Sequence, residues 1–378
     1  MAEDSGTNYR YQKSINAFFF GKIATKKKAL QKRNGGCACA AWRHYAWSAT
    51  FEKVDETIAK SKCEHPYKSK FKQHIIIFGE IIMSTEKKTM FKGVCTALIT
   101  PFRDGKIDYK SLKNIIEFQI EQGVDALLIN GTTGESATLS ECEKRDLISF
   151  AVHEVGGRVP IIAGTGSNCT QKSIHLSEFA LEVGADAILV VTPYYNRASN
   201  EGLIEHYEAI ANSVDIPLIL YNVPSRTGVN IPLSVYDKLA NHPNIVAVKE
   251  ASTSVSDFAK LSQKCSDRLT LYSGNDDLIT PTLSLGGDGV ISVLSNILPK
   301  EVGGICKLWF EGKTKEATTL QLKLLPLINA IFSEVNPIPI KAIMSNKGFC
   351  DEEYRLPLSP LNEEKKKALL EVFNNYKF

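Results

Sequence analysis

A lysine stands at the end of a short apolar run, residues 245–251, which reads Ile-Val-Ala-Val-Lys-Glu-Ala. A run this short and this apolar predicts a strand covered on both faces, as in a parallel sheet flanked by helices. Burying an ammonium group is costly, so Lys249 must find a partner or lose its proton. A neutral amine is the nucleophile that Schiff-base chemistry with a carbonyl compound requires. The structural alternative is a lysine that extends its charge into solvent, and the heptapeptide alone favours that alternative.

Other side chains capable of chemistry also follow apolar runs. Thr132 and Thr133 lie in the segment Asn-Gly-Thr-Thr-Gly-Glu-Ser, whose bare backbone N–H groups could bind a carboxylate. Tyr195 follows a second run, and Tyr221 and Arg226 lie at the end of a third. Each feature alone has an ordinary explanation, such as a helix N-cap, a tyrosine at the edge of the core or a surface arginine. Their joint placement favours one shared site.

The elements that would position these residues form a regular series. From Met90 onward, eight apolar runs alternate with amphipathic segments of helical length. Such alternation predicts parallel strands joined by right-handed crossovers, and eight units over about 200 residues predict an α/β fold of the (β/α)8 barrel type. Active sites in such barrels lie at the C-terminal ends of the strands, so the residues above are expected on one rim. The expected strands are residues 93–102, 126–132, 160–166, 187–193, 217–224, 245–251, 269–274 and 289–293, with helices near 109–122, 140–155, 170–183, 201–212, 233–240, 255–263, 276–285 and 301–311.

The barrel is expected to occupy residues 90–312 and to be followed by a C-terminal helical region, residues 313–378. The first 89 residues differ in charge, with 17 Lys+Arg against 8 Asp+Glu, which leaves 28 against 34 of the chain's 45 and 42 for the remainder. They are expected to be a basic extension that is disordered or a non-native leader. Residues 1–82 in particular read as a translated leader, because Met83 and Met90 each precede a sequence that looks complete.

Two other interpretations of the first 89 residues stay open. Their acidic residues argue against an organellar transit peptide, and a basic arm for nucleic acid is disfavoured because charge runs are usually solvated tails. The acidic remainder gives no reason to expect nucleic-acid binding, and no apolar run approaches the roughly 20 residues of a membrane helix. The nine cysteines show no paired metal-ligand spacing and predict buried thiols in a reducing, cytoplasmic compartment.

Eight motifs, in order along the chain, identify a resemblance. They are GTTGESATL from Gly131, IAGTGSN from Ile162, VTPYYN from Val191, LYNVPSRTG from Leu220, VKEAS from Val248, SGND from Ser273, GVISV from Gly289 and NPIPIKA from Asn336. In these motifs the sequence resembles the pyruvate-dependent class I aldolase family, from about Phe91 to the C-terminus. The first 89 residues have no counterpart in that pattern.

The resemblance implies a Schiff-base reaction without a metal or other cofactor. Lys249 would form an imine with pyruvate, the derived enamine would attack L-aspartate 4-semialdehyde, and cyclisation would free the lysine, in the first committed step of diaminopimelate and lysine biosynthesis. The resemblance assigns proton transfer to Thr132, Tyr221 and Tyr195. Hydroxyl groups suit this task because they pass protons without carrying charge into the site. The tyrosine matching Tyr195 comes from a neighbouring subunit in the family, which implies a homotetramer (a dimer of dimers) or a dimer.

The resemblance also assigns substrate binding. Thr133 and the backbone near Ile291 would hold the pyruvate carboxylate, Arg226 would bind the carboxylate of the semialdehyde, and Gly274 would leave space beside the lysine. N-acetylneuraminate lyases and sugar-acid aldolases share the lysine and the tyrosine, but they typically carry serine at the position of Thr132 and lack the arginine. The sequence therefore favours the family members that condense pyruvate with aspartate semialdehyde. A non-catalytic barrel scaffold is the remote alternative.

Regulation is a separate expectation. Family members inhibited by lysine have two histidines and a glutamate where this sequence has Glu141, Lys144 and Lys172. Two lysines would repel the ammonium groups of the inhibitor, so feedback by L-lysine is expected to be weak or absent. Asn168 and Tyr194 still match the inhibited members.

Overall fold

Eight parallel strands form a closed barrel in the computed structural model, which describes residues 89–376. The strands follow one another around the barrel in the order β1-β10-β9-β8-β7-β6-β5-β4, so the (β/α)8 expectation is confirmed. The expected leader, residues 1–82, lies outside the described residues. The strands are β1 (Gly93–Ala97), β4 (Ala126–Ile129), β5 (Ile161–Gly164), β6 (Ala187–Val191), β7 (Leu218–Asn222), β8 (Ile245–Glu250), β9 (Thr270–Ser273) and β10 (Gly289–Ser292).

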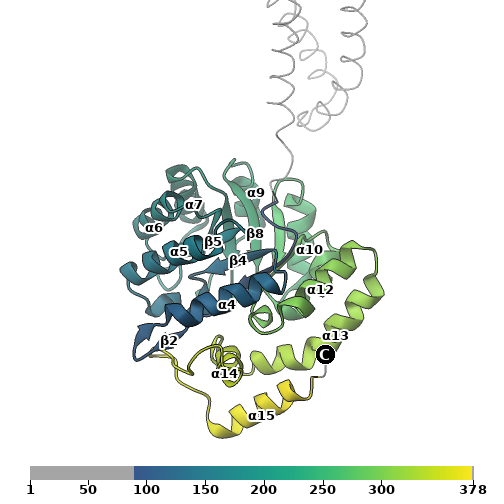
Figure 1. The fold of residues 1–378 in the computed structure, drawn as a ribbon. Coiled ribbons are helices and arrows are strands. Elements are labelled where there is room, and N and C mark those ends of the chain that lie inside the picture. The colour runs from purple at the N-terminus through teal and green to yellow at the C-terminus, as the bar shows by residue number, and fades with distance from the viewer. Residues whose placement is uncertain (1–88, 377–378) are drawn as a thin grey trace, which may run out of the picture. The chain divides into compact units, whose positions relative to one another are not determined.

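Helices surround the barrel and alternate with its strands (Figure 1). They are α4 (Tyr109–Glu121), α5 (Glu141–Val155), α6 (Thr170–Glu182), α7 (Asn200–Ser213), α9 (Leu233–Leu239), α10 (Val255–Cys265), α11 (Ile279–Ser284) and α12 (Pro299–Phe310). Short helical turns follow several strands, namely η1 (Thr132–Gly134), η2 (Ser136–Thr138), α8 (Pro224–Thr227), η3 (Asp276–Leu278) and η4 (Leu294–Asn296). These turns occupy the strand ends where the sequence places its chemically capable side chains.

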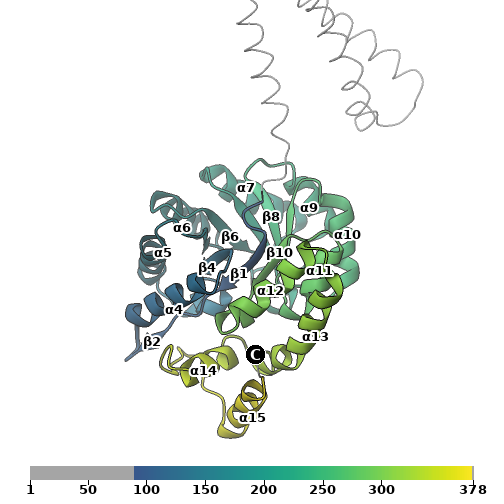
Figure 2. The ribbon, with the colours of Figure 1, turned by 45° about the vertical axis from the view of Figure 1, so that its right-hand side comes forward.

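Three further helices follow the barrel. They are α13 (Thr314–Ile331), α14 (Ile338–Asn346) and α15 (Glu363–Asn374). Helix α13 packs on α12, and α15 packs on α13 and α14 (Figure 2). The proposed boundary between the barrel and the C-terminal region, after residue 312, falls between α12 and α13. None of the helices within residues 89–376 is both long enough and apolar enough to span a bilayer.

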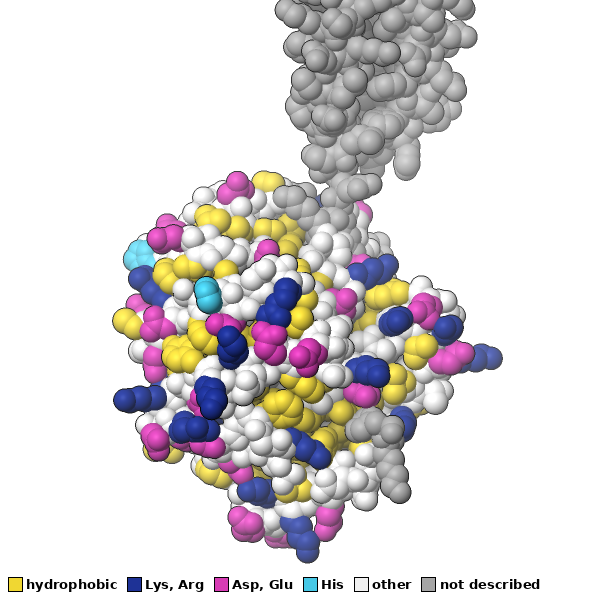
Figure 3. Space-filling model, in the orientation of Figure 1, with side chains coloured by type: hydrophobic (Ala, Val, Ile, Leu, Met, Phe, Trp, Pro, Cys, Tyr) yellow, Lys and Arg dark blue, Asp and Glu magenta, His cyan; other side chains and the backbone are white. Residues whose placement is uncertain are grey.

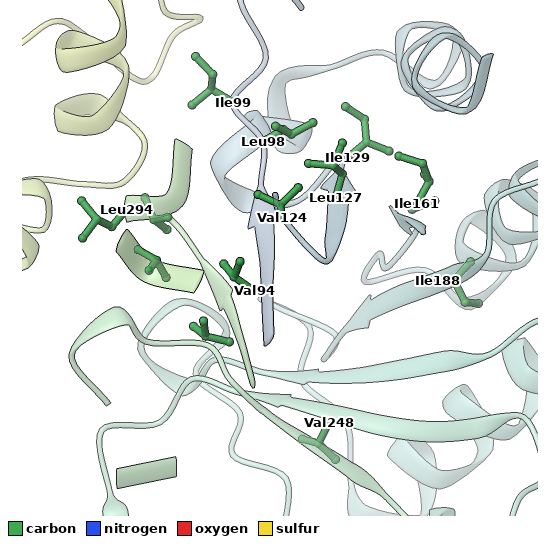
Figure 4. Packing of buried hydrophobic residues seen from close by; sticks show 14 of the residues in the cluster. Val94, Leu98, Ile99, Val124, Leu127, Ile129, Ile161, Ile188, Val248 and Leu294 are labelled. Atoms are coloured by element: carbon green, nitrogen blue, oxygen red, sulfur yellow. The ribbon is translucent and has the colours of Figure 1, made fainter. Parts of the chain in front are cut away.

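Alternation along the strands separates two buried layers. Val94, Leu127 and Val248 point outward and pack with apolar helix residues in the larger layer, part of which is drawn in Figure 4. Ile219 and Tyr221 belong to the smaller layer, which is drawn almost entirely from the strands and fills the barrel. Successive side chains of a strand face opposite sides of the sheet, so both layers are expected of barrel strands. Full burial of each large aliphatic side chain contributes roughly 1.5–3 kcal/mol.

An aromatic pair fills one end of the barrel interior. Phe91, just before β1, stacks on Tyr272 of β9 with ring centroids 4.1 Å apart. The Tyr272 hydroxyl donates a hydrogen bond to the Phe91 carbonyl at 2.8 Å, and burial raises the pKa of this phenol. The pair therefore closes the end of the barrel where β1 begins, which is opposite to the expected active rim.

One expected strand is shorter than predicted. Residues 93–102 were expected to form one strand, but β1 ends at Ala97, and β2 (Phe102–Arg103) pairs antiparallel with β3 (Lys106–Ile107). Pro101 lacks the N–H that would continue a ladder, and its carbonyl accepts from Asp108 N at 2.9 Å. The apolar composition therefore continued past the point where strand geometry ends.

The visible surface carries both signs of charge. In Figure 3, lysine and arginine side chains are interspersed with aspartate and glutamate over the described part of that face. This face therefore presents no continuous basic surface of the kind that attracts nucleic acid.

Candidate active site

Lys249 points into the barrel. It stands on β8 between Ala247 and Ala251, which both belong to the interior layer, and side chains two residues apart share a face of a strand. Only 6% of the residue is exposed. The alternative in which the lysine extends into solvent is therefore wrong. The pairing of β8 with β7 places Tyr221 directly beside it, and Lys249 Nζ lies 4.4 Å from the centre of the tyrosine ring.

A thiol also lies in the interior of the barrel. Cys95 of β1 is fully buried within the same layer as Tyr221, and burial raises the pKa of its thiol. The thiol is therefore neutral at physiological pH and unreactive as a nucleophile. The amine of Lys249 and the phenol of Tyr221 remain the reactive pair at this level of the barrel.

A carboxylate fixes the strand ends from outside. Glu250, next to Lys249, accepts hydrogen bonds from Asn222 Nδ2 at 2.9 Å, from the Tyr236 hydroxyl at 3.0 Å and from Ser252 N at 2.8 Å. Burial raises the pKa of the Glu250 carboxyl. Asn222 is the residue after Tyr221, so this outer pair ties β7 to β8 at the point where the inner pair meets. Sequence reasoning missed Glu250, although a glutamate beside a lysine in an apolar strand was the available signal.

The loop after β4 is held in an unusual conformation. Thr132 begins η1 and is partly exposed, whereas Thr133 is buried. Asn130 and Glu135, on either side of them, have φ angles of 58° and 54°. Such left-handed values are uncommon for residues other than glycine and need support from the surrounding structure.

A buried ion pair provides that support. Lys341 Nζ of α14 lies 2.6 Å from Glu135 Oε1, and both side chains are completely buried. Arg355 N also donates to Glu135 Oε2 at 3.2 Å. Removing one member of such a pair leaves a buried charge uncompensated, at a cost of about 3–5 kcal/mol. The C-terminal helical region therefore holds the loop that carries Thr132 and Thr133.

Arg226 lies near the same region through a backbone contact. It is exposed on α8, and its Nη2 donates to the carbonyl of Asn336 at 3.2 Å. The side chain of Asn336 in turn donates from Nδ2 to Thr133 Oγ1 at 3.0 Å. The structure thus brings Thr133 and Arg226 together through one residue that sequence reasoning did not single out as a site residue.

Gly274 lies directly after β9, and Ile291 lies on the neighbouring strand β10. A side chain at Gly274 would place its Cβ 2.7 Å from the Cβ of Ala251, and Gly274 N donates to the Glu250 carbonyl at 2.7 Å. The glycine therefore permits close approach of the chain after β9 to the end of β8. Ile291 is fully buried on β10 in the interior layer.

Asp276 fixes the chain just after Ile291. Its Oδ2 accepts from Val293 N and Leu294 N, both at 3.0 Å, and burial raises the pKa of this carboxyl. Asp276 follows Gly274 and Asn275, the two residues after β9. It is a second supporting carboxyl that the motif contained but sequence reasoning did not assign.

Tyr195 is set apart from the others within one chain. It is 93% exposed, and its φ of 70° is left-handed, whereas the neighbouring Tyr194 is 38% exposed. A large aromatic side chain exposed on a strained backbone indicates a surface that another molecule can cover. The structure of a single chain therefore places Tyr221 beside Lys249 and joins the Thr133 loop to Arg226 through Asn336, but it leaves Tyr195 in solvent.

Glu141, Lys144 and Lys172 are the residues expected to decide inhibition by L-lysine. Lys172 Nζ lies 3.4 Å from Glu141 Oε1, and both side chains are exposed. Lys144 is more enclosed, and burial lowers the pKa of its ammonium group. Within residues 89–376, no group of three or more His, Cys, Asp or Glu side chains could hold a metal ion.

Comparisons with known proteins identify relatives of the barrel and the C-terminal region. A family model described as the Dihydrodipicolinate synthetase family matches residues 90–375. A curated protein of Clostridium perfringens (strain SM101 / Type A), named 4-hydroxy-tetrahydrodipicolinate synthase, is 52% identical over 274 residues. That match covers 72% of this chain and 94% of the relative.

Solved structures share the fold at similar identity. The dihydrodipicolinate synthase of Aquifex aeolicus is 43% identical with a TM-score of 0.75, over 76% of this chain and 98% of that chain. The chloride-inhibited dihydrodipicolinate synthase of Acinetobacter baumannii, complexed with pyruvate, is 42% identical with a TM-score of 0.74. That match covers 76% of this chain and 98% of the other.

Proposed function

Because the chain belongs to the dihydrodipicolinate synthetase family, we propose that it condenses pyruvate with L-aspartate 4-semialdehyde to give 4-hydroxy-tetrahydrodipicolinate. It is thus a lyase of the class I aldolase type that begins diaminopimelate and lysine biosynthesis. The observation that carries this conclusion is the inward lysine of β8 beside Tyr221, in a chain that covers 94% of a synthase 52% identical to it.

The covalent step belongs to Lys249. Its amine attacks the ketone carbon of pyruvate, and loss of water gives an imine. Loss of a proton from the methyl carbon then gives an enamine, which forms a carbon–carbon bond with the aldehyde of the second substrate. The amino group of the bound semialdehyde next attacks the imine carbon, expels the lysine amine and closes the ring. Overall, one water is released, and no metal or other cofactor is required because the imine itself activates pyruvate.

Proton transfer belongs to three hydroxyl groups. Tyr221, beside Lys249 in the strand register, is the donor and acceptor nearest the imine, and Thr132 and Tyr195 extend the relay. The exposure and strained backbone of Tyr195 support a role in the site of a neighbouring subunit, so each site is completed by a second copy. We therefore propose a dimer, or a homotetramer built from two dimers.

Substrate binding belongs to the rim. Thr133 and the backbone near Ile291 hold the carboxylate of pyruvate, and Gly274 allows the chain to pass close to it. Arg226 binds the carboxylate of the semialdehyde, because a guanidinium group can form two parallel hydrogen bonds to a carboxylate. The six cysteines of the described residues are free thiols, and although Cys142 and Cys169 are exposed rather than buried as expected, free thiols support a reducing, cytoplasmic location.

The proposal is tested by comparing two reactions of the purified chain. Pyruvate consumption is measured with aspartate semialdehyde, and retro-aldol cleavage is measured with N-acetylneuraminate. We expect turnover only in the first assay, and Lys249→Ala serves as the inactive control. Turnover confined to N-acetylneuraminate would instead identify a lyase of the same family, and turnover of neither substrate would favour a non-catalytic barrel.

A further inference from the structure

One residue of the C-terminal region contacts both halves of the proposed substrate site. Asn336 lies just before α14, and only 7% of it is exposed. Its side chain reaches Thr133 after β4, whereas its backbone carbonyl accepts from Arg226 after β7. These contacts join segments separated by 203 and 110 residues in the sequence.

We propose that Asn336 is a positioning residue for substrate binding, which orients the Thr133 hydroxyl toward pyruvate and holds Arg226 at the mouth of the site. This inference rests on the proposed function and adds a role for the C-terminal region in it. Asn336 acts through the other two residues and contacts no reacting atom.

The orientation of Thr133 follows from its hydrogen-bonding capacity. A threonine hydroxyl has one hydrogen to donate and two lone pairs to accept with. Asn336 Nδ2 donates to Thr133 Oγ1 at 3.0 Å and thereby occupies a lone pair. The hydroxyl hydrogen then remains available for an anion, and a hydrogen bond to a carboxylate is stronger than one between neutral groups.

A single hydrogen bond to the backbone of Asn336 restrains Arg226. Its Nη2 bonds to the Asn336 carbonyl at 3.2 Å, which restrains a long side chain that is otherwise exposed. A guanidinium group has five N–H donors, so the remaining donors can still receive a carboxylate. Restraint before binding lowers the entropy lost when the substrate arrives.

Asn336 is itself held by its neighbours in the C-terminal region. Lys341, on the helix α14 that follows Asn336, forms the buried ion pair with Glu135 of the Thr133 loop. The Tyr354 hydroxyl donates to the Ile338 carbonyl at 2.9 Å. The amide oxygen of Asn336 is buried without a hydrogen-bond partner in the described part of the chain, so Thr133 is the side-chain anchor of the amide.

Steady-state kinetics of four variants tests the proposal. N336A should raise the KM for pyruvate by about tenfold while kcat changes less than about threefold, because a bond that orients the ground state is lost. T133V should do the same. The double variant should be no worse than T133V alone, since Asn336 affects pyruvate binding through Thr133. T318A removes an exposed side-chain hydrogen bond on α13 of the C-terminal region, away from the site, and should leave both KM values within about twofold.

Replacing the neutral amide of Asn336 with a carboxylate gives an independent test. N336D presents only acceptor oxygens, so it takes up the Thr133 hydrogen and repels the pyruvate carboxylate. Its KM for pyruvate should exceed that of N336A. Should N336A fail to fold, N336D and T133V carry the same comparison.

Two results would overturn the positioning role. One is an N336A enzyme whose KM for pyruvate equals that of the wild type, and the other is a double variant whose losses simply add. Borohydride trapping of pyruvate on the wild-type chain is run first. Absence of that adduct refutes the proposed function, whereas an adduct on the wild type with an unchanged N336A enzyme refutes only the role of Asn336.

Discussion

Lys249 and Tyr221 lie opposite each other across β7 and β8, with the lysine Nζ 4.4 Å from the centre of the tyrosine ring. The residues that follow them, Glu250 and Asn222, hydrogen bond on the outer face of the same two strands at 2.9 Å. One pair of adjacent positions therefore provides the reacting groups, and the next pair keeps the strands aligned. The proposed chemistry depends on this register.

Removing the hydroxyl of Tyr221 tests the proton relay. Tyr221→Phe should lower kcat by about 10²- to 10⁴-fold, because general acid–base catalysis contributes that much, and the KM for pyruvate should change far less. Tyr109→Phe is a matched control, since Tyr109 packs on Phe150 outside the barrel. A Tyr221→Phe enzyme with near-normal kcat would assign the relay to other groups.

The exposure of Tyr195 leads to a complementation experiment. Tyr195→Phe and Lys249→Ala should each be nearly inactive alone. In a mixed dimer, however, one site receives Lys249 from one chain and Tyr195 from the other. Random reassociation of equal amounts should therefore restore up to about a quarter of wild-type activity in a two-fold dimer. Persistent inactivity of the mixture, with mixed dimers shown to form, would place Tyr195 outside the neighbouring site.

The pair formed by Glu141 and Lys172 predicts insensitivity to L-lysine. Lys172 Nζ lies 3.4 Å from Glu141 Oε1, and Lys144 adds a second positive charge three residues after Glu141. These lysines repel the two ammonium groups of L-lysine. A titration of activity with L-lysine should show weak or no inhibition. The double change Glu141→His and Lys144→His, which restores the two histidines of inhibited family members, should increase sensitivity. Tight inhibition of the unmodified chain would contradict the prediction.

Acid sensitivity should depend on Glu143. Two hydrogen bonds from Arg355, together with hydrogen bonds from Ser140, lower the pKa of its carboxyl from 4.5 to about 2. A depressed pKa in the folded state stabilises the protein above about pH 4.5, and this contribution is lost as the pH falls toward 2. Glu143→Gln should reduce the free energy of unfolding by about 1–2 kcal/mol at neutral pH and flatten its dependence between those values. Denaturant unfolding at several pH values measures both effects, and an unchanged slope would refute the assignment.

Much of the fold was predictable because local patterns carried it. Hydrophobic periodicity marks the eight apolar runs and the helices between them, and Gly, Pro, Asn and Asp residues mark where they end. These patterns predicted both the barrel and the rim on which Lys249 stands. The shorter β1 was missed because Phe102 continues the apolar composition after Pro101. Composition alone does not show where a ladder stops.

The supporting residues of the site were not predictable in the same way. Glu135 meets Lys341 across 206 residues, and Thr133 meets Asn336 across 203. No local period links such positions, so only the folded chain shows that the C-terminal region supports the rim. The motif NPIPIKA contains Asn336 and Lys341, but its sequence says nothing about what they contact.

Trapping the imine between Lys249 and pyruvate is the most direct test of the proposed chemistry. The wild-type chain is incubated with pyruvate and sodium borohydride, and the intact protein and its peptides are examined by mass spectrometry. We expect one reduced pyruvate per chain, on the peptide containing Lys249, and none on a Lys249→Ala variant whose circular dichroism spectrum is unchanged. An adduct on another lysine, or turnover without any adduct at Lys249, would contradict it.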